Sequence, residues 1–227
     1  MLIIGHRGAA GEKPENTLSG IREARRAGAD MVECDVRLTK DNIAVLCHDT
    51  SLKRTHGIDA KIRNHTYKEL KKRTAGSDSP ICTLEEVFGD SLGKILINIE
   101  LKDRHSGLAT LELLRKPEYK PHADMVLLTS FSVRELIRVR NLNSKVNLGL
   151  LMRLNPFSFL AWERKLHLSA AGFHRLHLNK LAVEAAHQLD IFVFVYTVNR
   201  KGALKHLQAK DVDGVVTDFP AKFVKKK

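Results

Sequence analysis

The chain contains few cysteine, proline and aromatic residues for its length. Its 227 residues include three cysteines, six prolines and only 6% Phe, Trp and Tyr. The cysteines are odd in number and their spacing matches neither a zinc site nor a disulfide framework, so we interpret Cys34, Cys47 and Cys82 as reduced apolar side chains. Few prolines and 43% apolar residues argue against a disordered chain and predict one globular domain with a large core.

A long hydrophobic run is also absent. The longest apolar stretches, such as residues 191–195, have the length of a strand and fall far short of the ~20 residues that span a bilayer. A first strand predicted at residues 2–5 leaves no room before His6 for a cleavable signal peptide. We therefore expect a cytoplasmic protein that makes no stable insertion into a membrane.

Acidic residues are outnumbered by basic ones. The 26 Asp and Glu face 38 Lys and Arg, which gives a formal net charge of +12. Such a surface attracts phosphates, nucleic acid or anionic lipid headgroups without distinguishing among them. The basic residues are densest in residues 51–80, with eight Lys and Arg against three Asp and Glu, and three lysines end the chain at 225–227.

Short β-branched runs alternate with amphipathic segments along the whole chain. The runs are 2–5, 31–36, 95–101, 125–131, 146–152, 172–178, 191–198 and 214–218; the predicted helices are 17–27, 84–88, 108–115, 133–141, 157–168, 181–189 and 201–208, with a stub after Pro220. Eight βα units in one domain of this length predict a (βα)8 TIM barrel that spans residues 1–227.

One segment is too long for an ordinary connection between a strand and a helix. The turn-forming residues 39–42 and the apolar residues 43–46 predict a hairpin-like return that brings His48 toward the second strand. Residues 51–80 then form an insertion. Because the insertion starts directly after His48 and Asp49, at the end of a strand, we expect it to lie over the C-terminal mouth of the barrel.

Acidic side chains occupy one face of two predicted strands. Side chains two residues apart share a face of a strand, so Glu33 and Asp35 point toward the barrel axis. The same alternation turns Asn98, Glu100 and Lys102 inward on the next barrel strand. Three carboxylates in one place repel one another unless a cation joins them. All-oxygen ligands favour Mg²⁺ or Ca²⁺ over zinc or copper.

Two histidines stand beside these acids at strand ends. His6 and His48 are candidates for proton transfer, because an unperturbed imidazole has a pKa of ~6.5. Arg7 and Lys102 supply positive charge for phosphate oxygens. Histidines, acids for a hard cation and cations for an anion are together typical of a metal-assisted phosphodiester hydrolase.

Short motifs from the first strand to the last resemble the glycerophosphodiester phosphodiesterase family, in its small cytosolic bacterial branch. The motifs are His6-Arg7-Gly8, Pro14-Glu15-Asn16-Thr17, Glu33-Cys34-Asp35-Val36, Thr39-Lys40-Asp41, His48-Asp49, Ile99-Glu100-Leu101-Lys102, Ser130-Phe131, Thr197-Val198-Asn199 and Asp213-Gly214-Val215-Val216-Thr217-Asp218. The resemblance implies a (βα)8 barrel with an insertion after the second strand.

The resemblance also implies an activity and its residues. The expected reaction, part of glycerol and lipid metabolism, hydrolyses a small glycerophosphodiester to an alcohol and glycerol 3-phosphate and requires one divalent cation, Mg²⁺ or Ca²⁺. The implied roles are acid and base for His6 and His48, metal binding for Glu33, Asp35 and Glu100, phosphate binding for Arg7 and Lys102, and the substrate pocket for Phe131 and Tyr196. Tyr196 replaces the family's usual tryptophan, and Asn42 replaces a glycine, where asparagine tolerates left-handed backbone angles.

Two other readings remain at this point. A lysophospholipase D-like enzyme would keep the site and take lysophospholipids, and the basic insertion would favour it through weak contact with anionic lipid. A non-catalytic barrel that binds nucleic acid would use only the charge. Against it, the basic residues are not interleaved with aromatic ones apart from Tyr67, so we expect no nucleic-acid partner. The sequence leaves the oligomeric state and the alcohol leaving group open, and does not assign acid and base between the two histidines.

Overall fold

The computed structural model describes residues 1–224, and the lysines at 225–227 lie outside the described residues. None of the helices in residues 1–224 is long and apolar enough to cross a bilayer. In chain order the elements are β1 (Leu2–Gly5), α1 (Leu18–Arg26), β2 (Met31–Leu38), β3 (Ala44–Leu46), α2 (Lys53–His56), η1 (Ile62–Asn64), α3 (Tyr67–Thr74), α4 (Leu84–Ser91), β4 (Leu96–Leu101), α5 (Ser106–Leu114), η2 (Lys120–Met125), β5 (Val126–Ser130), α6 (Val133–Leu142), β6 (Asn147–Met152), η3 (Ser158–Ala161), α7 (Glu163–Leu166), β7 (Ala170–His174), α8 (Lys180–His187), β8 (Phe192–Tyr196), α9 (Ala203–Gln208), β9 (Gly214–Thr217) and α10 (Pro220–Phe223).

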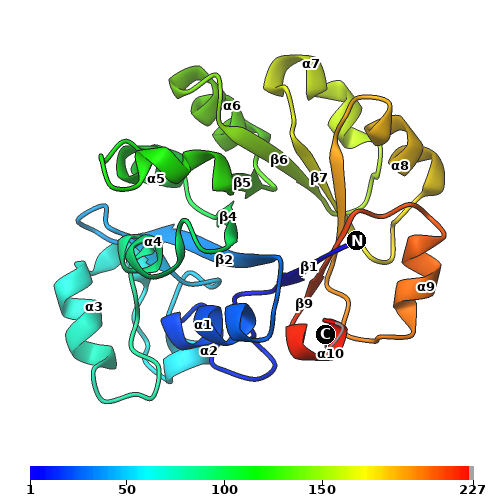
Figure 1. Ribbon diagram of the computed structural model, residues 1–227. Helices are drawn as coiled ribbons and strands as arrows, with labels where there is room; N and C mark the ends of the chain where they lie inside the picture. The colour runs from blue at the N-terminus through cyan, green and yellow to red at the C-terminus, as the bar shows by residue number, and fades with distance from the viewer. Residues whose placement is uncertain (225–227) are drawn as a thin grey trace.

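Eight parallel strands close into a barrel. Strand order runs β1-β9-β8-β7-β6-β5-β4-β2, and β1 also pairs with β2, so these eight strands have no free edge. The additional strand β3 is antiparallel to β2, with Val36 opposite Leu46. Helices lie outside the strands all around the barrel (Figure 1). The predicted (βα)8 barrel is confirmed, and the hairpin that returns the chain toward His48 is present.

Two apolar layers place the polar residues of the strands. The barrel interior holds a small cluster: Ile4, Met31, Leu127, Leu151, Ala170, Phe194 and Val216. A larger core between strands and helices includes Val32, Cys34 and Val36 from β2 and Ile97, Ile99 and Leu101 from β4. Since these residues point outward, the alternate residues of the same strands point to the axis, as the alternation predicts.

The three cysteines are free and buried. Burial raises the pKa of Cys47 to about 11 and the pKa of Cys82 to about 12. Thiols with such pKa values carry almost no thiolate near neutrality and are unreactive. Their interpretation as reduced apolar side chains agrees with the structure.

Two predicted elements are wrong in part. The strand predicted at 172–178 is β7 at Ala170–His174, because small residues are needed there: a Cβ on Gly172 would lie 2.5 Å from the Leu151 side chain and 2.7 Å from the Phe194 ring. Alanine and glycine carry little β signal, so the pattern favoured the leucines that follow. The helix predicted at 157–168 is broken at Trp162 into η3 and α7, and neither has a side-chain N-cap.

Residues 51–80 extend the β2–β3 hairpin. They contain α2, η1 and α3, and they bury apolar side chains against β3 and its continuation, in a cluster made of Val45, Cys47, Leu52, Ala60, Ile62, Leu70 and Ile81. Figure 1 shows α3 farther from the barrel strands than α4. The insertion therefore has a small core of its own, attached to the strand that leads into His48.

Candidate active site

A cavity of about 180 Å³ lies where the barrel strands end. Eight of the nine site residues predicted from the sequence line it: His6, Arg7, Glu33, His48, Glu100, Lys102, Phe131 and Tyr196. The ninth, Asp35, is 1% exposed and lies behind them. The topology thus brings all nine into one region, at the end of the barrel where catalysis takes place in this fold.

Three carboxylates form the centre of the site. Asp35 and Glu100 face each other in the register of β2 and β4, and one carboxylate oxygen from each of Glu33, Asp35 and Glu100 lies within 4.8 Å of the others. Burial, with the charge of Asp35, raises the pKa of Glu33 to about 7 and raises the pKa of Glu100. These acids lack enough positive charge from the protein, and buried oxygen ligands in this arrangement fit a hard divalent cation.

Lys102 joins two of the three acids. Its Nζ lies 3.0 Å from Asp35 Oδ1 and donates to Glu100 Oε1 at 2.6 Å. Burial alone would raise the pKa of Asp35, but Lys102 and then Arg7 hold it below its usual range. The ammonium therefore stabilises the ionised form of Asp35 and is placed to meet an anion at the same point.

The turn after β1 explains why the first motif contains glycine. Gly8 has φ +86°, and a Cβ there would lie 2.4 Å from the backbone of Gly20, so only glycine fits. Arg7 also has a positive φ, of 50°. This turn aims the Arg7 backbone N–H at Glu33 Oε2, to which it donates at 2.8 Å.

Asn16 fixes Asp35 from behind. Its Nδ2 donates to Asp35 Oδ2 at 2.9 Å, and the Asp35 N–H donates to Asn16 Oδ1 at 2.9 Å. Asn16 is buried and has φ +56°, which asparagine tolerates better than most residues. The N-cap of α1 is Thr17, whose hydroxyl accepts from Gly20 N. Asn16 is therefore a positioning residue for a carboxylate.

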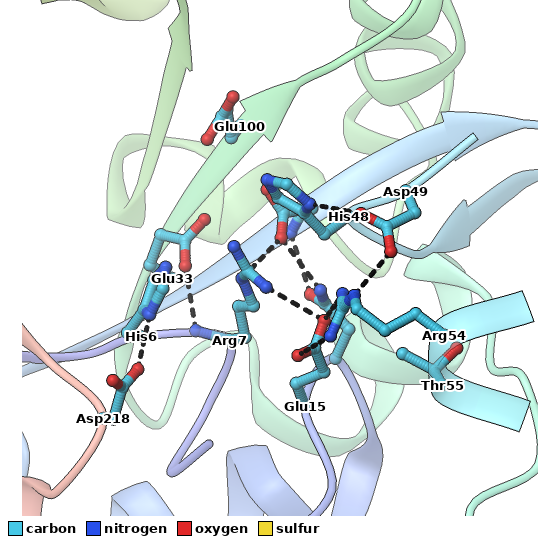
Figure 2. Close-up of polar contacts among 12 residues, drawn as sticks. His6, Arg7, Glu15, Glu33, His48, Asp49, Arg54, Thr55, Glu100 and Asp218 are labelled. Atoms are coloured by element: carbon cyan, nitrogen blue, oxygen red, sulfur yellow. Dashed lines mark hydrogen bonds and ion pairs between the residues drawn. The ribbon is translucent and has the colours of Figure 1, made fainter. Parts of the chain in front are cut away.

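Each histidine is held by a carboxylate at Nδ1. His6 Nδ1 lies 2.6 Å from Asp218 Oδ1, and His48 Nδ1 lies 2.8 Å from Asp49 Oδ1 (Figure 2). With Nδ1 engaged, Nε2 is the nitrogen of each ring that remains for substrate. Burial opposes protonation of His6, but Asp218 and the charge of Glu33 raise its pKa. Burial lowers the pKa of His48 despite Asp49. The two environments therefore move these pKa values in opposite directions.

Ion pairs connect the second histidine to Arg7. Arg54, from α2 in the insertion, donates to Asp49 Oδ2 at 2.6 Å and to both oxygens of Glu15 at 2.6 and 2.8 Å. Glu15 accepts from Arg7 Nη1 at 2.9 Å. Arg7 Nε lies 3.1 Å from Asp35 Oδ2 but is not aligned to donate to it. Figure 2 shows this network running from His48 to Arg7 through the insertion.

Aromatic side chains form one wall of the cavity. The rings of Phe131 and Tyr196 meet edge to face, with centroids 5.9 Å apart and planes at 87°. The Tyr196 hydroxyl donates to the Met152 carbonyl at 2.6 Å, and burial raises its pKa. The Tyr196 hydroxyl is thus bonded to the backbone, and the Tyr196 ring lines the cavity.

Five residues of the site had no role predicted from the sequence. Asp49, Asp218, Asn16 and Glu15 stand in motifs quoted above, and Asp218 directly follows a barrel strand, which is a usable signal for catalytic function. Arg54 lies in an insertion without periodic pattern, and its contacts depend on the fold of that segment.

Comparisons with known proteins agree with this geometry. Residues 6–222 match the Glycerophosphoryl diester phosphodiesterase family. A glycerophosphodiester phosphodiesterase of Caldanaerobacter subterraneus is 31% identical, over 96% of this chain and 94% of its own. The crystal structure of a Thermotoga maritima glycerophosphodiester phosphodiesterase is 32% identical with a TM-score of 0.85, covering 98% of this chain and 96% of that one. An Oleispira antarctica phosphodiesterase in complex with the product sn-glycerol-3-phosphate is 27% identical with a TM-score of 0.88, covering 98% and 95%.

Proposed function

The chain belongs to the glycerophosphoryl diester phosphodiesterase family, and we propose that it hydrolyses glycerophosphodiesters to an alcohol and glycerol 3-phosphate with one divalent cation. The observation that carries the proposal is the cluster of Glu33, Asp35 and Glu100 within 4.8 Å, in a cavity that also receives His6 and His48. The Oleispira phosphodiesterase, whose structure is a complex with the product sn-glycerol-3-phosphate, supports the same substrate class.

Three acids would hold the cation, which we propose to be Mg²⁺ or Ca²⁺. Bound by Glu33, Asp35 and Glu100, it would neutralise charge on the phosphate oxygens and polarise phosphorus toward attack. Lys102 and Arg7 would bind the remaining phosphate oxygens, Arg7 through the planar guanidinium that Glu15 orients. Phe131 and Tyr196 would contact the organic part of the substrate.

The surroundings of the two histidines assign the proton transfers. His6, bonded to Asp218 at 2.6 Å and facing Glu33, is favoured as an imidazolium and would protonate the leaving alcohol oxygen as its bond to phosphorus breaks. Burial lowers the pKa of His48 although its Nδ1 is bonded to Asp49, so it is favoured as neutral imidazole. It would take a proton from the water that forms the new bond to phosphorus. Opposed pKa shifts in a pair of groups are the usual basis of such an assignment.

We further propose that residues 51–80 influence which diesters react. Within residues 1–224 the insertion does not line the cavity. Arg54 nevertheless connects it to Asp49 and Glu15, so the insertion borders the entrance beside His48. Its basic charge would attract anionic substrates.

A coupled assay for released glycerol 3-phosphate tests the function. The purified chain should hydrolyse glycerophosphocholine or glycerophosphoethanolamine, lose turnover after exhaustive chelation with its helical circular dichroism unchanged, and recover it with Mg²⁺ or Ca²⁺. His48→Ala should lower turnover by about 10²–10⁴, the usual contribution of a general base. Full activity after chelation would contradict the metal site, and near-normal turnover of His48→Ala would contradict its role.

A second candidate keeps the same site and changes the substrate. A lysophospholipase D-like reaction would cleave the headgroup linkage of a lysophospholipid. The aromatic wall of Phe131 and Tyr196 gives an acylated glycerol apolar surface to contact. Measuring the choline released from lysophosphatidylcholine and from glycerophosphocholine separates the two, because only this second candidate predicts the faster rate on the acylated substrate.

A further inference from the structure

Exposed apolar side chains are concentrated in two segments that leave the catalytic end of the barrel. Among the exposed large hydrophobic residues of the described chain, five lie in the segments that follow β6 and β7: Leu154, Phe157, Leu160, Leu176 and Leu181. Leu154, Leu176 and Leu181 are 74%, 73% and 66% exposed. Strands β6 and β7 pair up to Met152 and Phe173, so both segments leave neighbouring strands at the catalytic end of the barrel.

The opposite end of the barrel provides a contrast. Leu142 ends α6 and Leu189 follows α8, and at 44% and 40% both are less exposed than Leu154, Leu176 and Leu181 and comparable to Phe157 and Leu160. Single exposed leucines of this kind are ordinary on protein surfaces. Several strongly exposed ones in two adjacent segments mark an interaction site.

The charges in these segments are of one sign. Arg153, Arg175 and Lys180 are all exposed, and residues 153–162 and 175–183 contain no acidic residue. The first acid beyond the second segment is Glu184, whose Oε1 lies 3.8 Å from Lys180 Nζ on the surface of α8. Apolar tips beside cations suit the surface of an anionic bilayer, which takes up both. A nucleic acid would use the cations and leave the leucines in water.

The exposed segments are continuous with the aromatic wall of the cavity. The Arg153 guanidinium lies 4.8 Å from the centre of the Phe131 ring, and Tyr196 is bonded to the carbonyl of Met152, the last residue of β6. His174, the last residue of β7, packs against Tyr196 with centroids 5.8 Å apart. A surface in contact with the exposed leucines would therefore meet the open side of the cavity.

We propose that the segments after β6 and β7 seat the catalytic end of the barrel on an anionic lipid bilayer. The leucines enter the interface, and Arg175 and Lys180 pair with lipid phosphates. Docking itself is independent of catalysis. Docking would bring the active site to the headgroup linkage of lysophospholipids in the bilayer, and this consequence rests on the proposed function.

Vesicle sedimentation tests the docking. The full chain is mixed with vesicles of 30% phosphatidylglycerol and 70% phosphatidylcholine, or of phosphatidylcholine alone. We expect the wild type to bind the anionic vesicles, and Leu154→Ser/Leu176→Ser/Leu181→Ser to bind them at least about tenfold more weakly. Arg175→Gln/Lys180→Gln should lose up to about fivefold for each cation. The control Leu142→Ser/Leu189→Ser, which changes leucines at the other end of the barrel, should bind as the wild type.

Several results would overturn the docking surface. They are failure of the wild type to bind anionic vesicles, equal binding by the triple leucine variant, or an equal loss in the control. Weaker binding of Arg175→Gln/Lys180→Gln to a duplex DNA oligonucleotide, with vesicle binding unchanged in the triple leucine variant, would assign the surface to nucleic acid instead. Thermal unfolding checks that each variant is folded.

Hydrolysis of soluble glycerophosphocholine separates docking from function. The triple leucine variant should keep this activity within about twofold and lose rate only on lysophosphatidylglycerol presented in vesicles. Vesicle binding without any diester hydrolysis would contradict the proposed function and leave the docking surface supported. Diester hydrolysis without vesicle binding would do the reverse.

Discussion

Asp218→Asn should impair the enzyme through His6 without removing a group that touches the substrate. Asp218 Oδ1 lies 2.6 Å from His6 Nδ1, and Asn199 holds the other carboxylate oxygen. An amide keeps the size of the side chain but removes the charge. A hydrogen bond to a charged group contributes about 1.5–3 kcal/mol, which corresponds to a loss of about ten- to hundredfold in turnover if it is fully used in the transition state.

The pH dependence distinguishes this role from a structural one. Asp218 raises the pKa of His6 against the effect of burial. As the proposed general acid, His6 must be protonated, so turnover falls as pH rises through its pKa. Without the carboxylate this pKa drops, and the fall should begin at lower pH. We would measure kcat from pH 5 to 9 at saturating glycerophosphocholine and fixed Mg²⁺.

A second histidine and aspartate pair provides the control. His187 Nε2 lies 2.9 Å from Asp213 Oδ2, at the start of β9 and therefore at the other end of the barrel from Asp218. Asp213→Asn should leave the pH profile in place even if it lowers stability. A profile for Asp218→Asn that matches the wild type, with turnover reduced less than about twofold, would refute the reasoning.

Three further predictions concern the groups around the acids. Asn16→Ala should lower the free energy of unfolding by about 2–4 kcal/mol, because two hydrogen bonds are lost and alanine is strained at a positive φ. In urea titrations Asn16→Gly should be more stable than Asn16→Ala by about 1 kcal/mol or more. Equal losses in the two variants would contradict the strain. Arg54→Gln should reduce kcat several-fold while its exposed neighbour Lys53→Gln does not, and equal activity would remove the link between insertion and site. Burial beside Asp35 raises the pKa of Glu33 to about 7 in the absence of a cation, so a cation must displace a proton below that pH. Calorimetry should therefore show the affinity for Mg²⁺ or Ca²⁺ rising with pH up to about 7 and levelling off above it. Constant affinity from pH 5.5 to 7 would contradict a proton held at this site.

The acid cluster was predictable because it depends only on regular structure. Strands alternate their side chains with a period of two, and the carboxyl ends of neighbouring parallel strands meet. Glu33 and Asp35 on β2 and Glu100 on β4 needed no knowledge of loops, and the register of Asp35 opposite Glu100 follows from packing their apolar neighbours outward.

Contacts that depend on loop conformation were beyond the sequence. Asn16 reaches Asp35 because it adopts φ +56°, and nothing in its neighbours requires that angle. Arg54 meets Asp49 and Glu15 through the particular path of the insertion. The error at β7 has a different origin, since Gly172 is selected by the bulk of Phe194, opposite it on the neighbouring strand β8, and not by strand propensity.

The protein compensates the negative charges of the three acids to different extents. Asp35 receives Lys102, Arg7 and Asn16, and its pKa is lowered against the effect of burial, so it is ionised and fixed. Glu33 and Glu100 are buried beside that fixed charge, and their pKa values are raised. The divalent cation that we propose would remove the repulsion among all three at once. The protein thus compensates the charge of Asp35 with its own groups, and that of Glu33 and Glu100 only in part, through the Arg7 N–H and Lys102. We expect such a site to be stable without metal and to bind a divalent cation with a gain in electrostatic energy.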